Sequence, residues 1–205
     1  LQGRGAEYYQ KLGYALQKNK KYAEAIDAYL KADTLKPDNI WNNRHLAICY
    51  RLNRNYQAAL SYYKKVEEAT PEDTNVIFHI GSCLAELGQY EEAANYFFKL
   101  DFIESNCIKA WRGIGWCSFI SGKKEQAMKY YEKIIEQKPL AIDYMNAGHV
   151  AWTMGDIQKA AALYGKSITA NGNRERFLEM FRKDKEALLK QGIQEEDIPL
   201  MLDLL

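Results

Sequence analysis

The chain repeats a pattern of small and aromatic residues every 34 positions. A small residue recurs at this step, at Gly13, Ala47, Gly81 and Gly115. An alanine recurs at Ala25, Ala59, Ala93 and Ala127, and four positions after each alanine stands an aromatic ring, at Tyr29, Tyr63, Phe97 and Tyr131. A fixed period of this length indicates stacked helix–turn–helix units, because one such unit cannot bury its apolar face alone. The period therefore predicts a helical repeat and not one compact core.

Proline and glycine mark where the units turn and end. Pro37, Pro71 and Pro139 each close a unit, because proline cannot continue a helix. Turns inside the units are expected near Lys20, Asn53, Gly88, Gly122 and Gly155. The predicted fold is an all-α, right-handed superhelix of five helix–turn–helix repeats at 6–39, 40–73, 74–107, 108–140 and 141–172.

Residues 173–205 break the period. Apolar residues on one face predict a helix over Arg174–Lys190, which would cap the last repeat. Asp197 and Pro199 predict a short, very apolar tail helix after it. The favoured role of this tail is packing on the cap. The alternative is an interaction segment for a groove or for another copy of the chain.

Charge and hydropathy exclude some classes of partner. The chain has 28 Lys and Arg against 27 Asp and Glu, a net charge of +1. This balance provides no long-range attraction to nucleic acid or to anionic membranes. No apolar run approaches the roughly 20 residues that span a bilayer. We therefore expect neither nucleic-acid binding nor membrane insertion.

Three of the four cysteines share one repeat position. Cys49, Cys83 and Cys117 are 34 residues apart, at a position that takes a small apolar side chain. Neighbouring helices pack about 8–10 Å apart, whereas a disulfide needs Cα atoms within about 7 Å. We therefore expect buried, reduced thiols, which favour a cytoplasmic location.

No arrangement of residues indicates catalysis. There is no nucleophile with a base and an orienting group, and no closely spaced cysteine pair for zinc. His45 and His79 share a repeat position and are expected to be edge histidines. Gly113 and Gly115 lie inside a predicted helix without a preceding strand, so they form no nucleotide-binding loop. The sequence predicts no catalytic residue, metal or cofactor.

The repeat resembles the tetratricopeptide repeat. Its fourth unit has the residues of that motif at the matching spacing: Trp111, Ile114-Gly115, Gly122, Ala127, Tyr131 and Pro139. The resemblance implies a non-catalytic scaffold or adaptor that binds a protein or peptide segment in a concave groove. Two alternatives stay open: a chaperone built on this repeat, or a regulatory or interaction domain of a larger enzyme or multidomain protein. Late in the motif, the first repeat has an alanine where the later repeats have larger residues. We therefore do not expect this chain to have the same groove geometry as other members of the family.

The resemblance also implies which face lines the groove, namely the first helix of each pair. On that face we expect partner contacts from Arg44, Arg51, Phe78, Arg112, Trp116, Phe119, His149 and Trp152. The aromatic residues would be apolar anchors, and the arginines would bond to carboxylates. The predicted ligand is an extended or helical segment with apolar and some acidic side chains. The tail at 195–205 has this composition itself and could compete for the groove.

Overall fold

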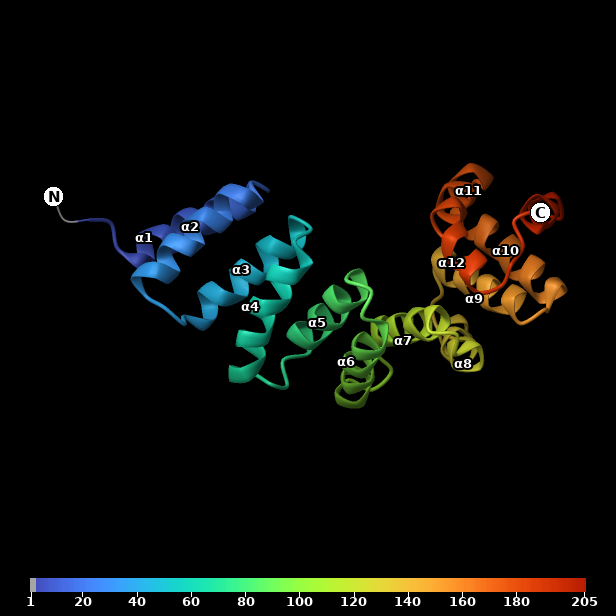
Figure 1. Cartoon of the computed structure of the whole chain (residues 1–205), viewed down its shortest axis with the longest axis horizontal. Coiled ribbons are helices and arrows are strands. Elements are labelled where there is room, and N and C mark those ends of the chain that lie inside the picture. The colour runs from blue at the N-terminus through green and yellow to red at the C-terminus, as the bar shows by residue number, and fades with distance from the viewer. Residues whose placement is uncertain (1–2) are drawn as a thin grey trace. The chain divides into compact units, whose positions relative to one another are not determined.

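The computed structural model describes residues 3–205, which form thirteen α-helices and no β-strand within that range (Figure 1). Ten of them follow the predicted pairs: α1 (Ala6–Lys18) and α2 (Tyr22–Leu35), α3 (Ile40–Leu52) and α4 (Tyr56–Ala69), α5 (Thr74–Glu86) and α6 (Tyr90–Ile103), α7 (Ile108–Ile120) and α8 (Lys124–Ile135), α9 (Ala141–Thr153) and α10 (Ile157–Asn171). Three more helices follow: α11 (Arg174–Lys183), α12 (Lys185–Lys190) and α13 (Asp197–Asp203). The prediction of an all-α helical repeat is confirmed.

The helices form two compact units. The first ends at Glu104 and contains α1–α6, and the second comprises Ser105–Leu205 with α7–α13. Within each unit the two helices of a pair pack on each other. The second helix of a pair then packs on the first helix of the next, as α2 does on α3, α4 on α5 and α8 on α9. Packing is therefore mainly between neighbours, as in other repeat proteins.

Small residues on the first helices make room for large rings on the second. A Cβ atom added at Gly13 would lie 2.7 Å from Cε1 of Tyr29, and one added at Gly148 would lie 2.5 Å from Cε1 of Tyr164. Both rings are fully buried. The 34-residue spacing therefore reflects a steric requirement, since only glycine or alanine stands opposite the large ring in each pair of helices.

Every pair of helices is joined through one residue in the left-handed backbone conformation. Glycine occupies this place in the last three pairs, with φ between 77° and 87°. Lys20 and Arg54 occupy it in the first two, with φ of 59° and 61°. The left-handed conformation costs a residue with a Cβ about 1–2 kcal/mol, which the surrounding packing must offset. The turn geometry is therefore conserved between the repeats although the residue is not.

The C-terminal helices cover the end of the second unit. One helix was expected over Arg174–Lys190, but it is divided at Asp184 into α11 and α12. The N–H of Asp184 donates to the carbonyl of Phe181, three residues earlier in the chain. In a continuous α-helix it would donate to the carbonyl four residues earlier. Phe177, Phe181 and Leu188 are buried in the core of this unit. The tail helix α13 adds Ile198 and Met201 to the same core.

The cysteine side chains are buried and form no disulfide within the described residues. Burial raises the pKa of the Cys49, Cys83 and Cys117 thiols to about 11. These groups are therefore protonated and unreactive at neutral pH. Among residues 3–205 no three His, Cys, Asp or Glu side chains are grouped so that they could hold a metal ion. None of the helices there has the length and apolar character needed to cross a membrane.

Candidate functional site

The first helices of the first unit present an exposed aromatic cluster. Tyr14 of α1 and Trp41 of α3 have 40% and 42% of their surface exposed, and their ring centroids are 6.3 Å apart. His45 lies one helical turn after Trp41, and these two rings are 4.0 Å apart. Beneath them, Gln17 Oε1 lies 2.9 Å from both the Tyr29 hydroxyl and Nδ1 of His45. This amide links His45 of the cluster to the buried Tyr29.

Trp41 and Tyr14 line a cavity of about 270 Å³ together with Glu7, Gln10 and Lys11. Most of the surface inside it is apolar, and the charged groups come from α1. A cavity of this size has room for one large apolar side chain. Exposed aromatic rings in such a recess are the usual anchors of protein interfaces.

A second cavity, of about 330 Å³, lies between the end of α3 and α5. Its lining residues are Arg51, Leu52, Arg54, Tyr56, Phe78, His79, Ser82, Cys83 and Glu86. The Nε of Arg51 donates to the Tyr63 hydroxyl at 3.1 Å, which aims the guanidinium along this face. Among the described residues, no salt bridge joins Arg51 or Arg54 to a carboxylate. This cavity therefore combines an aromatic wall with two cations suited to an acidic side chain.

The other two predicted arginines already hold carboxylates of this chain. Arg44 pairs with Asp73 at 2.9 Å. Arg112 forms two bonds of 2.8 Å to the buried Asp143. These bonds to Asp143 raise the pKa of Arg112. In both cases the carboxylate belongs to the first helix of the next repeat or caps it, so these arginines tie adjacent repeats together.

Asp73 shows how this tie works at a helix end. Its carboxylate accepts the N–H groups of Asn75 and Val76 at the start of α5. Burial acts to raise its pKa, but the Val76 N–H and the Arg44 guanidinium outweigh that effect, and the pKa of Asp73 lies below its usual value. The charged carboxylate thus serves both the helix cap and the ion pair.

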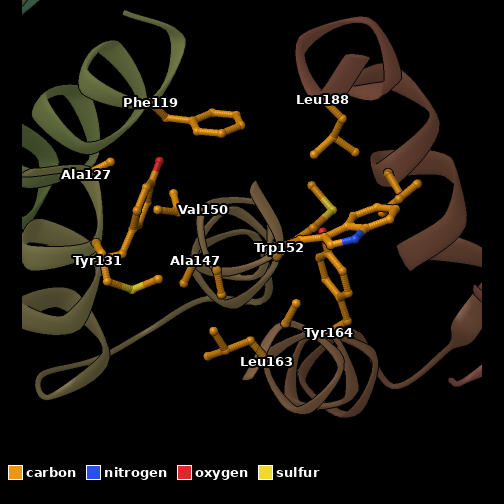
Figure 2. Close-up of a cluster of buried hydrophobic side chains, with 14 of the residues drawn as sticks. Phe119, Ala127, Tyr131, Ala147, Val150, Trp152, Leu163, Tyr164 and Leu188 are labelled. Atoms are coloured by element: carbon orange, nitrogen blue, oxygen red, sulfur yellow. The ribbon is translucent and has the colours of Figure 1, made fainter. Parts of the chain in front are cut away.

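The second unit does not present the face predicted for it. Phe119 and His149 are fully buried, and Trp152 is 7% exposed. Figure 2 shows Phe119 and Leu188, on α7 and α12, pointing into the space beside Val150 and Trp152 of α9. The placement of Phe119 and His149 on a partner-binding surface is therefore corrected, because the C-terminal helices cover this face. Trp116 is half-buried and packs at the edge of the same core.

Polar contacts hold the C-terminal helices on this face. His149 lies 2.7 Å from the Tyr164 hydroxyl through Nδ1 and 3.2 Å from Asp184 Oδ2 through Nε2. The side chain of Gln191 donates to the carbonyl of Ile120 at 3.0 Å. Lys124 donates to the carbonyls of Thr153 and Gln191. The cap is thus bonded to α7, α8 and α9 as well as packed on them.

We expect His45 to make the aromatic cluster sensitive to acid. Burial, with Arg44 and Lys18 nearby, lowers the pKa of His45 below its ordinary value of 6.5. The folded state therefore favours the neutral ring, so we expect the stability of the first unit to fall as the pH drops through about 6.5. NMR titration of His45 should give a midpoint below that of an unfolded histidine. The variant His45→Gln should lose less stability between neutral pH and pH 5.5 than the wild type, and equal losses would contradict this assignment.

Tyr14 and Trp41 were not among the residues expected to contact a partner. Both lie on the predicted groove face, at positions equivalent to His149 and Ile142 of the fifth repeat. The sequence signal was therefore present, since large rings on such a face need either a covering segment or a ligand. The sequence predicted a cap on the last repeat, but it did not show that this cap would also cover the first-helix face that carries Phe119 and His149.

Comparison with known proteins supports the repeat assignment. One family model, described as a tetratricopeptide repeat, matches residues 51–117, and a second of the same description matches 6–39, 108–139 and 144–174. Together these matches span most of the chain. No curated protein matches the chain significantly.

Several solved structures share the fold. YrrB, described as a TPR protein with an unusual peptide-binding site, is 21% identical over 85% of this chain and 90% of its own, with a TM-score of 0.71. MamA of Desulfovibrio magneticus RS-1 is 16% identical over 83% and 97%, with a TM-score of 0.76. A tetratricopeptide repeat protein from Parabacteroides merdae is 20% identical over 97% and 83%, with a TM-score of 0.64. At these identities the likeness concerns the fold alone.

Proposed function

Because the chain belongs to the tetratricopeptide repeat family, we propose that it is a non-catalytic scaffold whose first unit binds a segment of a partner protein. Protein interaction is the typical role of this repeat. The observation that carries the proposal is the exposed pair Tyr14 and Trp41 beside an apolar cavity. Buried free thiols support a reducing compartment such as the cytoplasm.

The proposed contact surface runs over α1, α3 and α5. Trp41 and Tyr14 accept an apolar side chain in one cavity. Arg51 and Arg54 donate to a carboxylate in the other, where Phe78 adds apolar contact. The ligand is therefore an extended or helical segment that has an apolar residue and an acidic residue. Arg44 positions α5 through Asp73 and contributes to the surface indirectly.

The charge-assisted part of this recognition can be separated from the apolar part. Arg51 is half-buried beside Tyr63, where a bond to a carboxylate is less screened by water than at an open surface. Glu86 lines the same cavity and disfavours a second acidic group close by. One acidic residue per segment is the arrangement that this cavity fits.

Peptide binding to single-residue variants tests the proposal. Short fluorescent peptides selected from an unbiased library on the full chain are titrated against the wild type and the variants by anisotropy. Trp41→Ala should weaken binding about tenfold or more, because a buried aromatic anchor is lost. Arg51→Met should weaken the binding of acidic peptides by a similar factor and leave the binding of their amide analogues unchanged.

Leu35→Ala provides the matched control. Leu35 is 54% exposed at the end of α2 and lines neither cavity, so binding should not change. If the library yields no binder, or if Trp41→Ala binds every selected peptide as the wild type does, the first unit is not the interaction surface.

A further inference from the structure

The tail helix α13 is apolar on two faces. Ile198 and Met201 point into the core of the second unit and are 8% and 3% exposed. Leu200 and Leu204, four residues apart and thus on one side of the helix, are 64% and 63% exposed. One face of α13 therefore lacks a covering element within the described residues.

This outer face borders a concave site. A cavity of about 500 Å³, here called the tail pocket, is lined by Trp152, Ile157, Asp197, Leu200, Met201, Asp203 and Leu204. Ile157 is 53% exposed, and the neighbouring Met154 is 44% exposed. Single exposed apolar residues are ordinary on a protein surface, but a group of them around a recess marks an interaction site.

The charges at the tail pocket are of one sign. Asp197 and Asp203 line it, and among the described residues neither forms a salt bridge. Glu195, a few residues before, is paired with Lys185 at 2.6 Å. Arg174 lies near the end of α13 but donates to the carbonyl of Leu202. An apolar recess bordered by two unpaired carboxylates favours a ligand that brings cations beside its apolar groups.

We propose that the tail pocket docks an amphipathic helix of a partner protein that has Lys or Arg beside its apolar face. The apolar side chains fill the recess between Trp152 and Leu204, and the cations meet Asp197 and Asp203. A symmetric pair of two copies would bring the same carboxylates together, which charge repulsion disfavours. An anionic membrane surface is disfavoured for the same reason. This surface lies in the second unit and is independent of the aromatic cavity of the first.

The probe is a synthetic amphipathic helical peptide with leucine on one face and lysine on the other, compared with a matched peptide that has glutamate in place of lysine. We expect the full chain to bind the lysine peptide at least about tenfold more tightly than the glutamate peptide. The double variant Leu200→Ser with Leu204→Ser should bind the lysine peptide about tenfold or more weakly than the wild type does. The double variant Asp197→Asn with Asp203→Asn should weaken the binding of the lysine peptide by a smaller factor. It should also make that binding less dependent on salt concentration.

The control variant combines Leu140→Ser with Glu125→Gln, which changes an apolar and an acidic residue exposed elsewhere on the second unit. It should bind as the wild type does. Circular dichroism checks that all variants keep their helix content. Equal binding of the two peptides, or no effect of the Leu200 and Leu204 changes, would overturn the proposal. Sedimentation showing a wild-type dimer that the same leucine changes convert to a monomer would also overturn it, since the occupant would then be a second copy.

Discussion

Replacing Phe181 with alanine is expected to lower the free energy of unfolding of the second unit by about 3–5 kcal/mol. The ring is 2% exposed, and its centroid lies 5.4–5.7 Å from the rings of His149, Tyr164 and Phe177. Removing it leaves a cavity lined by large rings that belong to three different helices, so the gap cannot easily close. Chemical denaturation of the full chain, followed by circular dichroism, measures the loss.

Phe102→Ala is the matched control, because the same atoms are removed from a ring that is 90% exposed at the end of α6. Its effect should be within about 0.5 kcal/mol. If Phe181→Ala costs no more than Phe102→Ala, the cap is not packed against α9 and α10 as described, and the covered face of the second unit would have to be reconsidered.

Gly148→Ala is expected to lower the stability of the second unit by about 1–3 kcal/mol. Alanine normally stabilises a helix interior relative to glycine by about 0.5–1 kcal/mol. Here its Cβ would lie 2.5 Å from Cε1 of Tyr164, a ring that is fully buried and in contact with His149. Overpacking therefore outweighs helix propensity, and the melting temperature should fall.

Gly165→Ala, on the neighbouring helix, is expected to have the opposite effect on stability. Gly165 lies inside α10, and no atom comes within 4 Å of an added Cβ. With no steric conflict, helix propensity alone applies, and stability should rise by about 0.5–1 kcal/mol. The two glycine variants should thus shift the melting temperature in opposite directions. Shifts of the same sign would show that the close approach of α9 to Tyr164 does not limit the packing.

The repeat architecture was predictable because a steric rule underlies it. Each ring at the position of Tyr29 or Tyr164 needs a small residue opposite it, so the requirement recurs along the sequence and can be read without a structure. The helix ends were predictable for a similar reason, since proline and the left-handed turn residues act locally. A single sequence thus reveals the structural requirements that act between near residues or recur in every repeat.

The candidate site was less predictable because exposure depends on contacts distant in sequence. Trp152 and Trp41 both lie on first-helix faces, yet α11–α13 cover Trp152 in the second unit, whereas Trp41 is 42% exposed within the first unit. Likewise Arg112 was expected to bond to a ligand carboxylate and instead bonds to Asp143, 31 residues away. Arg112 thus bonds to a carboxylate, but this carboxylate belongs to the chain itself.

The first helix of the chain's first unit has few buried residues. Within α1 only Gly13 is buried, whereas α9 buries eight residues. Segments of this kind open locally at a small cost in free energy, and their amide protons exchange quickly with solvent. Because Tyr14 of α1 forms one wall of the aromatic cavity, a bound partner would clamp α1 against α3. Ligand affinity would then include the entropy lost in ordering α1, and protection from hydrogen exchange would increase there first.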